Sequence, residues 1–216
     1  MRLGAFIPIK AQSRRVPGKN LREVGGKPLY RWIIDAAMQS QAFDAVFVDT
    51  DSDEIAKAAE MMGVMVIGRD PSLARDDANG NDLLCHHAER FPDFDVYCQL
   101  FATAPFLRAG TIARAIDDLL ASPRNDSVLT AVEAPGWHWF NAQPINFRPG
   151  ILPRSQDAPK LIRETTGLYA IRREPLLRYR CRVGATPLFV MVNPIEAVDI
   201  DDESDLARAQ EIAAKL

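Results

Sequence analysis

The chain has 216 residues, of which 47% are hydrophobic and 25% charged, and its formal net charge at pH 7 is −3. These proportions are typical of a soluble globular protein, and the length suits one α/β core rather than two independent domains. A slightly acidic chain is not expected to bind nucleic acid through phosphate contacts. Three scattered cysteines, Cys85, Cys98 and Cys181, without Cys-x-x-Cys spacing argue against a disulfide framework or a zinc site, and favour a reducing, cytoplasmic location. The first apolar run, Leu3–Ile9, is too short for a membrane span and lacks the plan of a signal peptide.

The charges are unevenly distributed along the chain. Residues 1–31 contain eight basic residues and one acidic residue, whereas residues 196–211 contain seven acidic residues and one basic residue. A basic and an acidic segment suit a site that holds a polyphosphate together with a divalent cation. Two solvated surfaces would explain the same charge counts.

Short apolar runs alternate with segments of helical period, which predicts βαβ units around a mostly parallel sheet. Asp51 and Glu54 are expected to cap the second helix, which Gly63 ends. The last helix should bury Leu206, Ala209, Ala213 and Leu216. The predicted strands cover residues 3–9, 45–49, 64–67, about 95–101 and 127–132. The predicted helices before the last one cover about 28–40, 80–90 and 110–122, and the second helix is the one that carries Ile55, Ala58, Ala59 and Met62.

The pattern changes between about residues 133 and 165. Five prolines in this stretch forbid long helices, and no clean period appears. Because a structureless loop of about 30 residues is unusual in a compact domain, we predict a functional arm or lid that contains a hairpin. The parallel pattern is expected to resume near Leu168.

The first predicted strand leads into a basic loop, at the end of a strand where open α/β sheets bind phosphate. The loop matches neither G-x-G-x-x-G nor the Walker pattern, because Ser13 stands where the first glycine belongs and Asn20 follows the lysine. Phosphate binding would therefore depend on side-chain charge rather than on a glycine cradle. A solvated basic loop is the alternative explanation. The loop's cations are Lys10, Arg14, Arg15 and Lys19.

The stretch Ile7-Pro-Ile-Lys-Ala-Gln-Ser-Arg-Arg-Val-Pro-Gly-Lys-Asn20 resembles the nucleotide-binding loop of the acylneuraminate (sialic-acid-type) cytidylyltransferases. The usual loop of that family has Arg at the position of Lys10 and Gly-Gly at Ala11-Gln12, so this chain keeps the cation but not its bidentate geometry. The resemblance implies that the triphosphate and nucleotide are held by Lys10, Arg14, Lys19 and Asn20.

The similarity extends over nearly the whole chain. It implies a three-layer, Rossmann-like nucleotide-diphospho-sugar transferase (GT-A-like) fold with a mostly parallel sheet, one cytidylyltransferase domain over residues 1–216, and a protruding dimerisation arm. The segment Arg69–Gly80 resembles the part of the family that cups the cytosine, and by position Arg69, Ala78 and Gly80 would line the base pocket. Small residues such as Ala78 and Gly80 allow the backbone to approach a base closely.

Two further segments resemble the sugar side of the family's pocket. In Ala102–Arg108, Thr103 stands where the related Kdo cytidylyltransferases have a metal-binding Asp, which counts against that branch. Phe101 replaces the Gln usual in sialic-acid enzymes and is closer to the pseudaminic-acid type. Arg154 would be the fork for the sugar carboxylate. The full set of sugar contacts that the resemblance implies is Phe101, Thr103, Arg154, Gln156 and Tyr169.

Asp199-Ile-Asp201 is the candidate metal site. Residues two apart on a strand face the same side, so both carboxylates of Asp199 and Asp201 would share one space while Ile200 points into the core. Two hard oxygen donors suit Mg²⁺, which completes its shell with water and phosphate. The bare pattern also fits a helix cap at Asp201. Its match to the family ending Asp-Ile-Asp-x-x-x-Asp-(Leu/Phe) favours the metal.

The resemblance implies that the anomeric hydroxyl of a nonulosonic (sialic-acid-like) sugar attacks the α-phosphorus of CTP, giving CMP-sugar and pyrophosphate. Lys19, Arg14 and Asp201 would be the catalytic residues, with Mg²⁺ on Asp199 and Asp201. The general base stays open between Asp201 and a metal-bound hydroxide. A homodimer is implied, in which the arm completes the partner's sugar pocket.

Two alternatives remain. One is a nucleotidyltransferase of the same fold that uses another sugar, such as Kdo. The other is a non-catalytic, nucleotide-binding regulatory module, suggested by the altered residues Lys10, Ala11 and Phe101. The aromatic pair Trp137 and Trp139 in the arm fits stacking on a sugar ring and, better, a dimer interface. His86 and His87 lack spaced partners and are expected on a helix surface or in the core.

Overall fold

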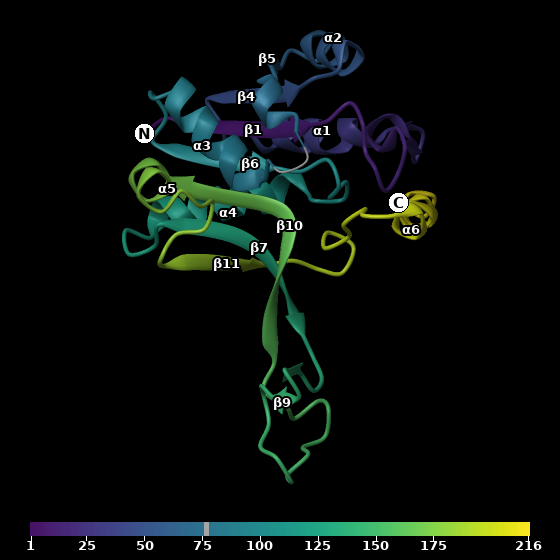
Figure 1. The fold of residues 1–216 in the computed structure, drawn as a ribbon, viewed down its shortest axis with the longest axis vertical. Helices are drawn as coiled ribbons and strands as arrows, with labels where there is room; N and C mark the ends of the chain where they lie inside the picture. Colours follow the sequence, from purple (N-terminus) through teal and green to yellow (C-terminus); the bar gives the residue numbers. More distant parts are fainter. Residues whose placement is uncertain (76–77) are drawn as a thin grey trace.

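β1 (Leu3–Ile9) is buried along almost its whole length and forms the middle of a parallel unit. It pairs in parallel with β4 (Ala45–Thr50) on one side and with β6 (Val96–Leu100) on the other. The structure, a computed structural model, describes residues 1–75 and 78–216, and within them these strands belong to a seven-stranded sheet of order β11-β7-β10-β6-β1-β4-β5 (Figure 1). The predicted strands are thereby confirmed.

One strand departs from the predicted parallel pattern. β10 (Leu161–Arg172) lies between β6 and β7 (Ser127–Ala134) and runs antiparallel to both, so the expected parallel continuation near Leu168 is wrong. β10 is the returning half of a ribbon that begins with β7, and antiparallel strands can be joined directly without a crossover helix. The other strand pairs of the seven-stranded sheet, which include β5 (Met65–Gly68) on β4 and β11 (Pro187–Met191) on β7, are parallel.

Helices cover both faces of the sheet and give the three layers that the sequence predicts (Figure 1). α1 (Leu29–Ser40), α2 (Asp53–Met61) and α4 (Ala109–Ala121) share one apolar cluster with the sheet. α3 (Gly80–Arg90) and α5 (Arg173–Tyr179) share the cluster on the other face. α6 (Glu203–Ala213) packs in a third cluster with the loop that follows β1. No helix within residues 1–75 and 78–216 is both long and apolar enough to cross a bilayer.

The boundaries of α2 and α6 correct three sequence-based expectations. Ser52, not Asp51, caps α2, and its hydroxyl accepts from the backbone N–H of Ile55. Asp202, not Asp201, caps α6, in a capping box with Asp205. The side chain of Asp201 is therefore not needed by the helix. Leu216 lies beyond α6 and is exposed rather than buried on its face.

The segment between β7 and β10 extends away from the body as an arm (Figure 1). Its base is an antiparallel ribbon, and its tip contains the short hairpin of β8 (Trp139–Phe140) and β9 (Gln143–Pro144). The buried side chain of Asn146 ties the arm together, because it donates to the carbonyls of Gly136 and Pro159 and accepts from the N–H of His138. Several large apolar residues of the arm are exposed: Trp137, Trp139, Phe140, Ile145, Ile151, Leu152 and Ile162.

A charged network lies buried beside the aromatic residues of the α3 face. His87 Nε2 is 2.7 Å from one carboxylate oxygen of Asp49, and Arg69 Nε is 3.0 Å from the other. Burial lowers the pKa of His87 from its ordinary value of 6.5, and the Asp49 carboxylate offsets only part of this effect. His87 is therefore neutral in the fold.

We expect this histidine to make stability fall on mild acidification. Below pH 6.5, its ordinary pKa, the unfolded chain protonates His87 while the fold keeps it neutral, so protons favour unfolding. The free energy of unfolding should lose up to about 1.4 kcal/mol per pH unit through this group. Urea unfolding followed between about pH 7.5 and about pH 5.5 measures the slope, which His87→Gln should flatten and His86→Gln should retain.

The turn between β2 (Glu23–Val24) and β3 (Lys27–Pro28) generates a second prediction. Gly25 and Gly26 have φ values of 58° and 80°, the left-handed pair that a tight two-residue hairpin needs. A Cβ on Gly25 would lie 2.8 Å from Cβ of Ala213 in α6, whereas one on Gly26 would meet nothing within 4 Å. Gly25→Ala should thus cost about 2–3 kcal/mol of unfolding free energy and Gly26→Ala about 1 kcal/mol, measured in urea. Equal losses would show that contact with α6 does not matter.

Candidate active site

A cavity of about 810 Å³ opens at the carboxyl ends of the parallel strands. The loops that follow β1, β4, β5 and β6 all contribute to its wall, as expected for a ligand site of an open α/β sheet. The cavity brings together residues that lie up to 95 positions apart, from Pro8 to Thr103. Of the residues predicted for the site, nine line it: Lys10, Arg14, Lys19, Asn20, Arg69, Ala78, Gly80, Phe101 and Thr103.

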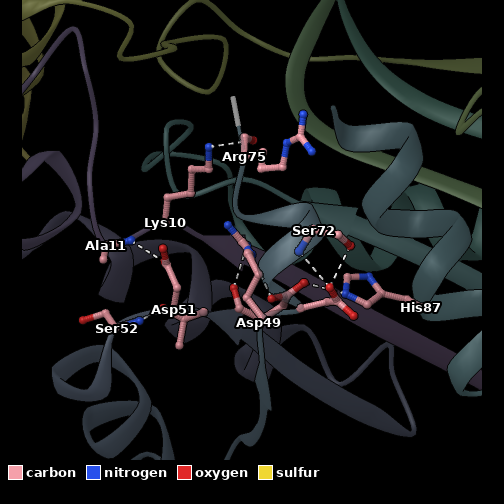
Figure 2. A network of polar contacts seen from close by, with 11 residues as sticks. Lys10, Ala11, Asp49, Asp51, Ser52, Ser72, Arg75 and His87 are labelled. Carbon is pink, nitrogen blue, oxygen red and sulfur yellow. Dashed lines mark hydrogen bonds and ion pairs between the residues drawn. The ribbon is translucent and has the colours of Figure 1, made fainter. Parts of the chain in front are cut away.

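Hydrogen bonds between side chains and backbone groups hold the loop after β1 in place. Asp51, which follows β4, accepts the N–H of Ala11 at 2.7 Å, and Asn20 donates its side-chain amide to the carbonyl of Lys10 at 2.8 Å. Lys10 Nζ donates to the carbonyl of Arg75 at 3.1 Å (Figure 2). Asp51 therefore binds the backbone of the basic loop instead of capping a helix, a role that the sequence pattern did not predict. Asp76 and Asp77, in the segment expected to cup the base, lie outside the described residues.

Lys19 joins the basic loop to the acidic C-terminal segment. Its ammonium is buried and donates to the carbonyl of Ile200 at 2.7 Å. Burial lowers the pKa of Lys19, and the carboxylates of Asp201 and Asp199 offset this in part. Arg15 forms an ion pair with Asp201 at 2.7 Å, and both side chains are about half-exposed. The two oppositely charged segments thus meet beside the cavity, which Arg15 and Lys19 line but Asp199 and Asp201 do not.

Asp199 and Asp201 supply carboxylate oxygens, the donor type that a magnesium ion prefers, although they are not on a strand as predicted. The segment is extended without strand pairing, and Ile200 is buried while its N–H donates to the carbonyl of Thr103. Oδ1 of Asp199 is buried and has no hydrogen-bond partner among the described residues. A buried carboxylate oxygen without a donor suits a cation, and Mg²⁺ needs only one or two protein carboxylates. No group of three or more His, Cys, Asp or Glu side chains in the described part of the chain forms a metal cluster.

Gly80 lines the cavity at the first turn of α3, but its small size serves the protein's own packing. A Cβ there would collide with a guanidinium nitrogen of Arg182 and lie 3.0 Å from Oε1 of Gln99. Gln99 is fully buried and donates to the carbonyl of Gly80 at 2.9 Å. The sequence predicted a small residue here so that a base can approach closely. The structure adds a second reason, because the Arg182 and Gln99 side chains occupy the space of a Cβ.

The predicted sugar contacts divide into two groups. Phe101 lines the cavity and makes an edge-to-face contact with the fully buried Tyr169 at a centroid distance of 6.2 Å. Burial raises the pKa of Tyr169 to about 12, and its hydroxyl donates to Glu164 at 3.2 Å. The structure thus places Tyr169 behind the wall rather than in it.

Arg154 and Gln156 lie on the arm. Arg154 is exposed and its Nε is 2.6 Å from a carboxylate oxygen of Asp157. Neither Arg154 nor Gln156 lines the cavity of its own chain, because the arm points away from the body (Figure 1). Their predicted contact with a sugar cannot be made within one chain as the arm is placed here.

Comparison with known proteins agrees with this architecture. A family model described as "Cytidylyltransferase" matches residues 5–215. N-acylneuraminate cytidylyltransferase A of Danio rerio is 29% identical over 217 residues, which cover 97% of this chain and 50% of the relative. The chain spans about half the length of the N-acylneuraminate cytidylyltransferases that it matches.

A second curated relative is the Helicobacter pylori protein named "Pseudaminic acid cytidylyltransferase and UDP-2,4-diacetamido-2,4,6-trideoxy-beta-L-altropyranose hydrolase". It is 24% identical over 208 residues, covering 93% of this chain and 40% of the relative. The solved structure of CMP:2-keto-3-deoxy-manno-octonic acid synthetase complexed with CTP superposes with a TM-score of 0.75 at 20% identity, covering 100% of this chain and 99% of that one. This last likeness shows the nucleotidyltransferase fold that the sequence predicts. Because the family model covers nearly the whole chain, the chain belongs to the cytidylyltransferase family.

Proposed function

We propose that this chain transfers CMP from CTP to the anomeric hydroxyl of a nonulosonic acid, giving a CMP-sugar and pyrophosphate. The observation that carries the proposal is the cationic loop at one end of the 810 Å³ cavity, joined through Lys19 to the carboxylates of Asp199 and Asp201. The curated relatives named for N-acylneuraminate and pseudaminic acid support the sugar class. The free thiols of Cys85, Cys98 and Cys181 support a reducing compartment, and we place the reaction in the cytoplasm.

The loop cations would bind and orient the triphosphate. Lys10, Arg14 and Lys19 all line the cavity, and their charge would stabilise the negative charge that builds up on the phosphates during attack. The anomeric oxygen bonds to the α-phosphorus, the bond from that phosphorus to the β-phosphate bridge oxygen breaks, and pyrophosphate leaves. Holding the two reactants in line should supply much of the rate.

Mg²⁺ is the proposed cofactor, with Asp199 and Asp201 as the residues that would hold it. When bound, it would neutralise phosphate charge and lower the pKa of the attacking hydroxyl. The unpartnered Oδ1 of Asp199 supports this assignment, and Arg15 would have to release the carboxylate of Asp201.

A homodimer would complete the sugar side of the site. The arm carries Arg154 and Gln156 away from its own cavity, and its tip exposes Trp139 to 58% and Phe140 to 68%. Exposed apolar groups on an isolated arm are a typical interface signal. We infer that the arm of one copy reaches the body of another and presents Arg154 to the sugar carboxylate.

The metal assignment predicts a loss of turnover without loss of the fold. Asp199→Asn and Asp201→Asn should each lower pyrophosphate release by about 100-fold or more, because the metal loses a charged ligand. Release would be measured with CTP, Mg²⁺ and a panel of nonulosonic acids that includes Kdo. Glu211→Gln, an exposed acid of the same segment, is the control and should retain activity.

Unchanged turnover in both aspartate variants would contradict the metal site. CTP binding by the wild-type protein with no pyrophosphate release on any sugar would instead favour a regulatory module. Turnover on Kdo alone would assign the Kdo reaction.

The arm predicts a coupled loss of dimer and of sugar use. The double variant Trp139→Ser with Phe140→Ser should sediment as a monomer and show a Michaelis constant for the sugar raised about tenfold or more, with CTP binding unchanged. Met61→Ser, which replaces an 83% exposed apolar residue on α2, is the matched control. A monomeric wild-type protein with full activity would contradict the shared site.

A further inference from the structure

The proposed chemistry leaves one buried charged group of the site unexplained. Asp49, at the end of β4, accepts from Arg69 Nε at 3.0 Å and lies 2.7 Å from His87 Nε2, and its backbone carbonyl accepts from Arg69 Nη2 at 2.8 Å. The side chains of Arg69 and Asp49 are only 1% and 2% exposed. Figure 2 shows Asp49 and His87 pointing toward each other, with His87 contributed by α3.

This network is a poor way to stabilise a core. Burying an ion pair costs desolvation free energy that its own attraction often fails to offset, and apolar replacements of similar volume are commonly as stable. Apolar packing is available here, since Phe6 and Phe47 stack on each other at 5.0 Å and His87 stacks on Phe6 at 4.6 Å. The charges therefore point to a role beyond stability.

The protonation states make the network a rigid one. Asp49 is ionised: burial by itself would raise the pKa of this carboxyl, but the hydrogen bond from His87 and the charge of Arg69 outweigh burial and lower it. Because Asp49 can only accept, neutral His87 must carry its proton on Nε2. Nδ1 is then an unprotonated nitrogen, and it is buried without a partner among the described residues. Among the described residues, the imidazole therefore makes its one hydrogen bond to Asp49.

Arg69 is the member of the network that reaches the cavity. Two bonds to the side chain and backbone of Asp49 fix the orientation of its planar guanidinium. The segment that follows supplies apolar lining groups, Leu73, Ala74 and Ala78. A fixed N–H donor beside apolar walls suits the flat ring and carbonyl acceptor of a nucleobase.

We propose that Asp49 and His87 are positioning residues, which hold the Arg69 guanidinium at the cavity wall so that it binds the nucleobase of the substrate nucleotide. The inference rests on the proposed use of CTP. It assigns a function to His87, which touches no substrate and lies in the core 18 positions from Arg69 in sequence.

A double-mutant cycle on CTP affinity tests this role. His87→Leu leaves the carboxylate without its second donor and should raise the Kd for CTP with Mg²⁺, measured by calorimetry, about tenfold, whereas His87→Gln, which can donate from a similar position, should stay within about threefold. Arg69→Ala should raise the Kd at least as much. If His87 acts only through Arg69, the double variant Arg69→Ala with His87→Leu should bind no more weakly than Arg69→Ala alone.

Cys85→Ala, a buried truncation on the same helix, is the control: it should lower stability and leave the Kd unchanged. A wild-type Kd in folded His87→Leu, or additive losses in the double variant, would overturn the positioning role. If His87→Leu does not fold, Asp49→Asn replaces it in the cycle with the same expectations. If wild-type protein binds CTP but releases no pyrophosphate, the proposed CMP transfer is refuted, and the double-mutant cycle still decides the positioning role of Asp49 and His87. If wild-type protein has no affinity for CTP, both the CMP transfer and the positioning role are refuted.

Discussion

The hydrogen bond from the buried ammonium of Lys19 to the carbonyl of Ile200 is the contact on which the site depends, because it joins segments 181 positions apart. The basic loop near the N-terminus and the acidic segment near the C-terminus would each be a repulsive surface alone. Brought together, the carboxylates of Asp199 and Asp201 offset part of the desolvation of Lys19. If the proposed magnesium ion binds here, it and the loop cations would be alternative counter-charges for these acids.

The parallel strands provide the frame for this contact. β1, β4, β5 and β6 deliver four loops to one edge, so residues from Lys10 to Thr103 share a single cavity although no two of the loops are adjacent in sequence. Two aspartates at the end of β4 also hold other parts of the site in place. Asp49, the second-last residue of β4, fixes Arg69, and Asp51, the first residue after β4, fixes the backbone of the basic loop. A rigid sheet thereby orients charged groups that would otherwise be flexible.

Sequence patterns were sufficient for the alternating strands and helices of the parallel part of the sheet and for the cations of the loop after β1, since burial period and loop chemistry are local signals. The three layers and the other predicted cavity residues followed from the resemblance to the cytidylyltransferases, and β2, β3, β11 and α5 were not predicted. Sequence patterns failed where the answer depends on three-dimensional neighbours. Asp51 and Ser52 are both good cap residues one position apart, and only the position of Ala11 decides that Asp51 is used elsewhere. His87 was expected on a helix surface or in the core, and it lies in the core; its bond to Asp49 was not predicted, because Asp49 is 38 positions away on another element. The antiparallel course of β10 follows from the arm, whose irregular sequence carries no period.

The two halves of the site obey different physical constraints. The proposed nucleotide half lies within one chain, and the Arg69, Asp49 and His87 side chains behind it are buried and bonded to one another. That preorganisation favours tight discrimination of one nucleotide, since a fixed donor cannot adapt to a wrong acceptor. The residues expected on the sugar half, Arg154 and Gln156, are on an arm that extends away from the cavity of its own chain (Figure 1). If the proposed reaction and dimer hold, changes in the arm and at the cavity rim near Phe101 would alter the sugar without touching the buried network of Arg69, Asp49 and His87. Under that proposal, relatives named for different nonulosonic acids are the expected outcome of the division.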